Sequence, residues 1–207
     1  MSRIISSLLF ILISNTGFSY SWNQYYHACV LNDKTICTKS VKKTVVAIMT
    51  QSWVKKSEEI NEIEDLNLNN SGIYNLRPLA GLTKLKTLNM KNNKIVDTTP
   101  LKKLTNLIIV DLTGNKITKL DGFANAFKLN WLFLDSNEIA DLSPLSNLHR
   151  LEILSLDNNF ISDISPIYGL EKLGSIHLNG NNIIDYDGLS KMKSLCVAEI
   201  DGVTHYF

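Results

Sequence analysis

The chain of 207 residues lacks a strong charge of either sign, because 21 Lys and Arg oppose 20 Asp and Glu, for a formal net charge of +1. No general electrostatic field therefore draws it to nucleic acid or to an anionic membrane. Its four His and three Cys are too few and too scattered to indicate a metal scaffold. Apolar residues make up 44% and charged residues 20%, values that are typical of a folded soluble protein and exclude a disordered one.

The apolar run near the start, residues 4–13, is too short for a membrane span. It has roughly half of the ~20 apolar residues that cross a bilayer. Arg3 precedes it and small, polar residues follow it, which predicts a secretory signal peptide over residues 1–19. Cleavage after Ser19 or Ser21 fits this layout. We expect a secreted, periplasmic or cell-surface protein without a stable membrane span.

What the sequence has in abundance is one repeat, 22 residues long and free of insertions. Its most visible element is an Asn that recurs with this period, while Ser71 holds the preceding place. The recurring residues are Asn93, Asn115, Asn137, Asn159 and Asn181. Around each of them the pattern is L-x-x-L-x-L-x-x-N-x-I, as in "LNWLFLDSNEI". This is the leucine-rich repeat pattern, in which each turn of a solenoid adds one short strand to a parallel sheet.

The chemistry of the repeat supports this fold independently of the pattern's name. The recurring leucines cannot be buried within one unit of 22 residues, so they must be buried by stacking. The Asn amide can satisfy backbone groups where the chain leaves the sheet, and we expect the five to form a structural ladder. All four prolines share one phase, and Ser143 and Ser165 precede two of them. We read Ser, Thr or Asp here as the N-cap of a short helical turn.

The predicted fold is therefore an α/β leucine-rich repeat solenoid. It has a curved parallel β-sheet on the concave face, short helical turns on the convex face and a helical cap before the first repeat. Val41, Val45, Met49 and Trp53 lie four apart and would form the face of the cap helix that covers the first repeat. We divide the chain into the signal peptide at 1–19, the N-terminal cap at 20–62, six repeats at 63–192, and a truncated seventh repeat with a C-terminal cap at 193–207.

The ends of the array contain the three cysteines and an apolar tail. Cys29 and Cys37 would form a disulfide in an oxidising compartment. Strands stack ~4.7–4.9 Å apart, so Cys196 would lie too far from both within one solenoid. Cys196 is then a free thiol or a link to a second chain, which predicts a possible dimer. Val203, Tyr206 and Phe207 could close the C-terminal end.

The motifs "IADLSPLSNL" and "ISDISPIYGL" add a family resemblance. With the 22-residue period, they resemble the internalin family of bacterial surface proteins. The resemblance covers roughly residues 40–207. It implies a secreted, non-enzymatic protein-binding module.

Side chains of the predicted strands fall into three columns on the concave face, by the two-residue period of a strand. The first column is Asp65, Thr87, Ile109, Trp131, Ile153, Ser175 and Val197. The second is Asn67, Asn89, Asp111, Phe133, Ser155, His177 and Glu199. The third is Asn69, Lys91, Thr113, Asp135, Asp157, Asn179 and Asp201. Two aromatic side chains thus stand at the middle of this face, with isoleucines beside them and acids around them.

An apolar centre with a polar rim is typical of a protein-binding patch with aromatic anchors. The predicted partner-binding residues are Ile109, Asp111, Trp131, Phe133, Asp135, Ile153, Ser155, Asp157 and His177. The partner would be a protein or peptide with apolar and basic groups, on a host or a cell surface. Two alternatives to binding stay open: the aromatics could pack laterally within the sheet, or "YSWNQYYHA" near the N-terminus could cover them. A structural scaffold in the periplasm or cell envelope is the alternative function.

Catalytic or metal chemistry is not predicted. His177 would lie near Ser155 and Asp157, but a flat sheet open to water offers no oxyanion site for a catalytic triad. Asp135, Asp157 and Asn179 could supply oxygen ligands to Ca²⁺, although a solvated acidic edge is the better interpretation. The prediction is no catalytic residue, no metal and no cofactor.

Overall fold

The computed structural model describes residues 62–207. The predicted signal peptide, most of the predicted N-terminal cap and the predicted Cys29–Cys37 disulfide lie outside the described residues. No helix in this described part is long or apolar enough to cross a membrane.

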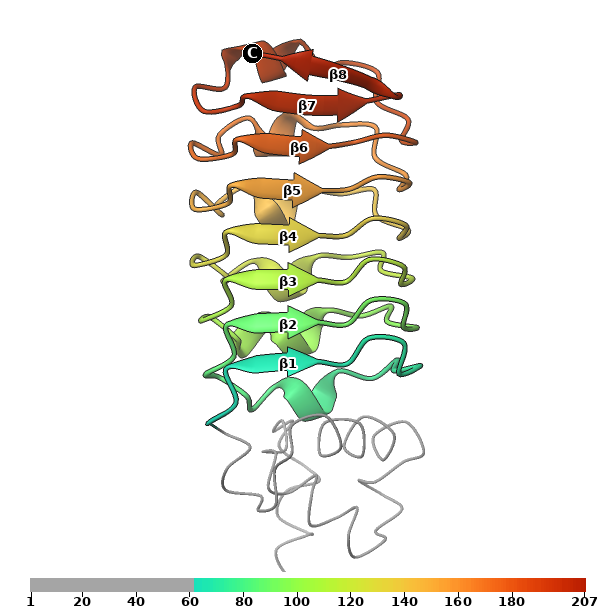
Figure 1. Ribbon diagram of the computed structural model, residues 1–207, viewed down its shortest axis with the longest axis vertical. Coiled ribbons are helices and arrows are strands. Elements are labelled where there is room, and N and C mark those ends of the chain that lie inside the picture. Colours follow the sequence, from blue (N-terminus) through green and yellow to red (C-terminus); the bar gives the residue numbers. More distant parts are fainter. Residues whose placement is uncertain (1–61) are drawn as a thin grey trace, which may run out of the picture.

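The described chain forms one eight-stranded sheet, whose strands follow each other in chain order (Figure 1). The first seven strands are parallel, and the eighth is antiparallel to the seventh. Their bounds are β1 Asp65–Asn67, β2 Thr87–Asn89, β3 Ile109–Asp111, β4 Trp131–Phe133, β5 Ile153–Ser155, β6 Ser175–His177, β7 Val197–Ile200 and β8 Val203–Tyr206.

The register of the parallel strands is set by the repeat length. Leu132 of β4 pairs with Val110 of β3 on one side and with Leu154 of β5 on the other, each 22 residues away in sequence. The same offset holds from β1 to β7. Residues of one phase therefore form straight columns across the sheet, as the sequence predicts.

The recurring apolar residues form a continuous core between the sheet and the turns that face it. In β4 and just beyond it, Leu132 and Leu134 are fully buried, and so are Leu129 before the strand and Ile139 after it. Burial of one such side chain contributes on the order of 1.5–3 kcal/mol. Because each repeat places its leucines against those of its neighbours, the core can only form by stacking, as in other solenoids.

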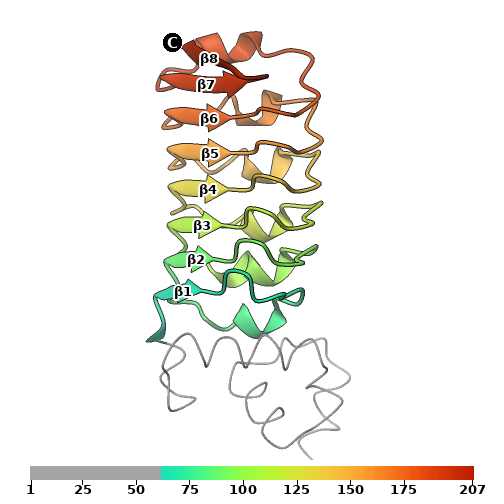
Figure 2. The same cartoon turned by 45° about the vertical axis from the view of Figure 1, so that its right-hand side comes forward.

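Short 3-10 turns cover the inner face of the sheet, opposite the concave face (Figure 2). They are η2 Arg77–Leu79, η3 Thr99–Lys103, η4 Asp121–Phe123, η5 Ser143–Leu145, η6 Ser165–Ile167 and η7 Asp187–Lys191. The predicted helical turns on the convex side are thus confirmed as 3-10 turns.

The capping of these turns differs from the prediction. In η5, Ser143 is the first residue of the turn and Pro144 the second, while the N-cap is Leu142, whose side chain is buried. The hydrogen bond comes instead from Asp141, whose Oδ1 accepts from the backbone N–H of Ser143 at 2.8 Å. The prediction of Ser as the N-cap is wrong, because the N-cap position faces the core and must be apolar.

An acidic or amide side chain plays the same part before the other turns. Asp163 Oδ1 accepts from the N–H of Ser165 at 2.8 Å, and the same contact precedes η2, η3 and η7. Hydrogen bonds from the hydroxyl and backbone N–H of Ser143 lower the pKa of Asp141. Those from the N–H and hydroxyl of Ser165 lower the pKa of Asp163. The ionised carboxylates therefore stabilise the start of the turns.

Two turns contain Gly where the others contain Pro, and the structure supplies the reason. A Cβ on Gly122 would lie 2.0 Å from the carbonyl oxygen of Thr98, and one on Gly188 would lie 2.2 Å from the ring of Tyr168. The N–H of Gly122 also donates to Thr98 Oγ1 at 3.2 Å, which Pro could not do. The neighbouring turn thus excludes any side chain at these two positions.

The Asn ladder lies where the chain leaves each strand. Asn137 Oδ1 accepts from the N–H of Ile117 in the preceding repeat at 3.0 Å. Its Nδ2 donates to the carbonyls of Leu112 and Leu134 at 3.1 and 2.9 Å. Equivalent bonds form at the other four positions. One buried amide therefore connects two successive repeats and satisfies three backbone groups that no strand pairs.

The C-terminal end differs most from the sequence prediction. After β7 the chain reverses through Asp201 and Gly202, both with positive φ, and returns as β8. Two residues with positive φ are what a tight hairpin requires, and Asp-Gly is a strong sequence signal for it. The predicted truncated seventh repeat did not include this hairpin. Val203, Tyr206 and Phe207 do not close the core, since their side chains are 55%, 80% and 48% exposed.

The ladder yields a first prediction. Asn137→Ala should lower the free energy of unfolding by about 2–4 kcal/mol, because one buried N–H and two carbonyls lose their partner. Urea unfolding at neutral pH measures the change. Asn147→Ala, at an exposed position in the same repeat, should stay within about 0.5 kcal/mol of wild type. Similar small effects of both substitutions would contradict a structural role for the ladder.

The turn carboxylates yield a second prediction, on pH. Because the pKa of Asp141 and Asp163 is lowered in the folded state, their contribution is present above the unfolded value of about 3.9. It is lost as the pH falls through the lower folded values, since protons then favour the unfolded chain. Urea unfolding from pH 7 downward should show a shallower loss of stability below about pH 4 in Asp141→Asn/Asp163→Asn than in wild type. Parallel curves would refute this.

Candidate functional site

The candidate site is centred on β4, at the middle of the concave face. Trp131 and Phe133 project from this strand on the side away from the core, while Leu132 between them is fully buried. Trp131 is 40% exposed, and Phe133 is partly buried. The two-residue period of the strand therefore leaves both aromatic rings outside the core, as predicted.

Isoleucines border the tryptophan on both sides. Trp131 is the register partner of Ile109 in β3 and of Ile153 in β5, and both isoleucines are partly buried. Neighbouring side chains at this spacing pack against each other. The lateral packing is real, but it still leaves two-fifths of the indole surface open to solvent. Together Ile109, Trp131, Phe133 and Ile153 form what we call the aromatic strip.

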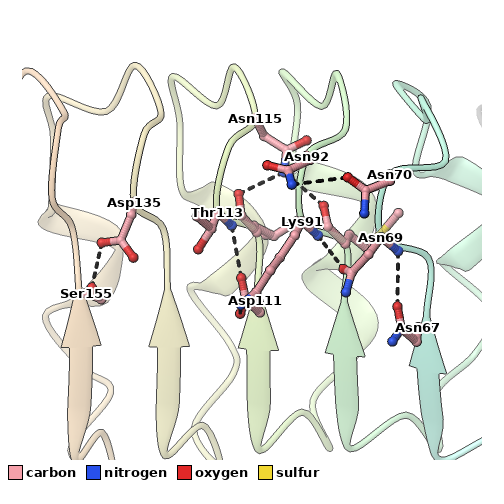
Figure 3. Close-up of polar contacts among 12 residues, drawn as sticks. Asn67, Asn69, Asn70, Lys91, Asn92, Asp111, Thr113, Asn115, Asp135 and Ser155 are labelled. Atoms are coloured by element: carbon pink, nitrogen blue, oxygen red, sulfur yellow. Dashed lines mark hydrogen bonds and ion pairs between the residues drawn. The ribbon is translucent and has the colours of Figure 1, made fainter.

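The acids above the strip have a structural role that sequence reasoning missed. Asp135 Oδ1 accepts from the N–H of Asp157 at 2.9 Å and from Ser155 Oγ at 2.5 Å. Asp157 Oδ1 in turn accepts from the N–H of Asn179 at 2.7 Å. Figure 3 shows the contact between Asp135 and Ser155. Each of these side chains extends the pairing of the sheet by one residue beyond the end of the strand.

Two amides of the same column continue this second ladder. Asn69 Oδ1 accepts from the N–H of Lys91 at 2.7 Å (Figure 3), and Asn179 Oδ1 accepts from the N–H of Gly202 at 2.7 Å. The ladder is interrupted at Lys91 and Thr113, whose side chains differ in type. The recurrence of Asp or Asn at one phase was visible in the sequence and could have indicated this role.

Asp111 is also occupied, by groups of its own chain. Its side chain is 9% exposed, and Oδ2 lies 2.8 Å from Lys91 Nζ. Oδ1 accepts from the N–H of Thr113 at 3.1 Å, as Figure 3 shows. The carboxylate is therefore already paired with a cation, so it is not an open site for a basic group of a partner.

The contacts of His177 differ from those expected from the sequence. Its Nδ1 is 3.1 Å from Glu199 Oε2, and its Nε2 is 3.3 Å from Ser175 Oγ. Ser155, which was expected near His177, bonds Asp135 instead. The Ser175, His177 and Glu199 side chains project from paired strands of an open sheet. A nucleophile would need oxyanion donors beside it, and the neighbouring strands already pair the backbone of Ser175 and His177.

Metal-binding geometry is not found in the described part of the chain. Residues 62–207 contain no group of three or more His, Cys, Asp or Glu side chains that could hold a metal ion. In the column that could have supplied ligands to Ca²⁺, the carboxylate oxygens accept from backbone N–H groups of the next repeat. Cys196 is an exposed free thiol.

Comparisons with known proteins agree with this architecture. The family described as Leucine Rich repeats (2 copies) matches residues 128–171. An internalin of Listeria monocytogenes, inlF, is 26% identical with a TM-score of 0.61, over 76% of this chain and 55% of that one. A leucine-rich repeat protein of Leptospira interrogans is 28% identical with a TM-score of 0.61, over 69% of this chain and 38% of that one. Curated protein sequences yield no match.

The class of protein follows from the register, the ladder and these matches: the chain is a leucine-rich repeat protein. Within that class it is internalin-like, as its repeat motifs indicated. It spans about half of the length of the internalin and less of the Leptospira protein. Leucine-rich repeat domains of this kind are typically protein-interaction modules.

The paired carboxylate on the concave face gives a third prediction. Lys91→Met should lower the free energy of unfolding by about 1–3 kcal/mol, because Asp111 is left buried without its cation. Lys91→Met/Asp111→Asn should recover most of that loss, which a double-mutant cycle by urea unfolding measures. Lys94→Met is the matched control, since Lys94 is exposed. Additive effects of the two substitutions would show that the pair is not coupled.

Proposed function

We propose that the chain is a secreted or surface-exposed binding module that recognises a protein or peptide through the aromatic strip. The observation that carries the proposal is the 40% exposure of Trp131, with Phe133 beside it, at the centre of the concave face. Large aromatic side chains in a central position are the usual anchors of protein interfaces. Binding would remove their remaining surface from water without any change in the repeats.

The chemistry of the partner follows from the groups around the strip. Asp135 and Asp157 are partly buried and keep their charge next to the aromatics, while Glu152 is exposed on the flank of β5. The nearby cation Lys91 is already engaged by Asp111. The upper half of the concave face is therefore acidic. This favours a partner with an exposed apolar side chain and adjacent Lys or Arg.

Export is the second part of the proposal. It is supported by the basic, apolar and polar order of residues 1–19 and by the likeness to an internalin. In this role the solenoid acts by binding alone, without enzymatic activity. The rigid stack of repeats holds the strip in one shape, which reduces the entropy lost on binding.

The fourth prediction tests the strip directly. A crosslinking pull-down from growth medium, cell envelope and host-cell extract should capture a discrete partner with the wild-type chain. Trp131→Ala/Phe133→Ala should reduce capture at least about tenfold, since loss of an anchor costs about 2 kcal/mol or more. Fractionation of the source cells should place the protein in the medium or at the surface.

Phe160→Ala is the matched control, because Phe160 is 58% exposed and follows the Asn of its repeat, away from the strip. It should capture the partner as well as wild type does. Thermal melts of all variants establish that they are folded. Equal capture by the strip variant and the control would place the binding surface elsewhere and reduce the aromatics to sheet packing.

A further inference from the structure

The last described strand, β8, has a strand neighbour on one side only. Its pairing with β7 shows which of its groups are free. The N–H of Phe207 donates to the carbonyl of Cys196, so bonded and non-bonded pairs alternate from there along the hairpin. Thr204 and Tyr206 fall in the non-bonded pairs. Their backbone N–H and C=O groups therefore point away from β7, along the open edge.

This edge lacks the features that normally prevent strands from pairing with other chains. Such edges are protected by Lys, by Pro, by bulges or by a covering element. The β8 sequence Val-Thr-His-Tyr contains neither Lys nor Pro nor any formal charge, and its β-branched and aromatic residues favour a strand. All four β7–β8 residue pairs are in continuous register, without a bulge.

Apolar side chains gather at the same end. Among residues 62–207, five of the ten exposed large apolar side chains lie beyond position 183. Tyr206 is 80% exposed, Val203 55% and Phe207 48%. The edge also has a fixed shape, because the ring of Tyr186 lies 5.7 Å from that of His205 and connects the hairpin to the preceding repeat. A rigid, apolar and unpaired edge is suited to strand addition.

We propose that β8 pairs in antiparallel orientation with β8 of a second copy of this chain, around a two-fold axis normal to the sheet. An antiparallel edge is complementary to itself, so each copy offers Thr204 and Tyr206 to the same groups of the other. No like charges oppose each other across the strands, since β8 is uncharged. This neutrality is one reason why the occupant is a second copy.

Charges beside the strand also fit this occupant. The two-fold axis exchanges the edge where strands begin with the edge where they end. Asp201, in the turn that ends β7, then lies on the same side as Lys193 of the other copy, which precedes β7. Both side chains are exposed. Parallel addition of a copy would place like edges side by side and lose this complementarity.

The dimer would change how the concave face acts. Rotation about the sheet normal keeps both concave faces on one side of a continuous sheet. The two Trp131 side chains would stand nine strand steps apart, roughly 40 Å along the sheet. Two sites on one rigid face raise the avidity for a repetitive partner. The dimer itself does not depend on the proposed partner.

The experiment measures the self-association of the full chain by sedimentation equilibrium, in a Cys196→Ser background with reducing agent. Cys196→Ser removes any dimer linked through that thiol. Wild-type β8 should give a concentration-dependent dimer. Thr204→Pro should weaken dimerisation at least tenfold, because it removes an N–H of the open edge but none that donates to β7. Thr204→Ala, which keeps this N–H, should dimerise like the parent.

A second variant keeps the test decisive if the proline disturbs the hairpin. Tyr206→Glu places one carboxylate from each copy near the two-fold axis and should also abolish the dimer, while Asp201→Lys should weaken it. Circular dichroism and melting of each variant establish the fold. A parent chain that is monomeric throughout its soluble range, or proline and alanine variants that dimerise equally, would overturn the proposal. Partner capture by a monomeric Thr204→Pro chain would leave the concave-face function intact.

Discussion

The whole solenoid depends on one buried amide per repeat. Every strand here is only three or four residues long, so the chain must leave the sheet again at once and turn back through the protein interior. A buried N–H or carbonyl without a partner costs about 1–3 kcal/mol. Asn115, Asn137 and Asn159 prevent that cost by bonding three backbone groups each, across two successive repeats. A leucine core alone could not make these turns stable.

The ladder also explains why the concave face can vary. Since the leucines and the amides determine the fold from the inner side, the outward positions of the strands are free of that duty. In β4 they hold Trp131 and Phe133, and in β6 they hold Ser175 and His177. Not all of them are free, however. Asp135 and Asp157 bond the backbone of the next repeat, so a second row of side chains serves both the fold and the charge of the face.

Most of the fold could be predicted from the sequence because its period is constant. With 22 residues between equivalent positions, the leucine phases, the Asn positions and the concave columns follow by counting, and the strands have that register. The Asp141 contact could not be predicted with the same ease, since it depends on which of two neighbouring polar residues faces the turn. The reversal at Asp201 and Gly202 was predictable in principle, because Asp-Gly between apolar runs is a hairpin signal.

The sequence by itself determined the class of fold, the core and the position of the aromatic strip, because each follows from periodicity and from the alternation of a strand. The tertiary structure alone decided how the polar groups are shared. It showed that Lys91 neutralises Asp111, that His177 meets Glu199, and that β8 ends the sheet with an open edge. Such outcomes depend on side-chain rotamers and on contacts between repeats, where differences of a few tenths of an ångström decide which hydrogen bond forms.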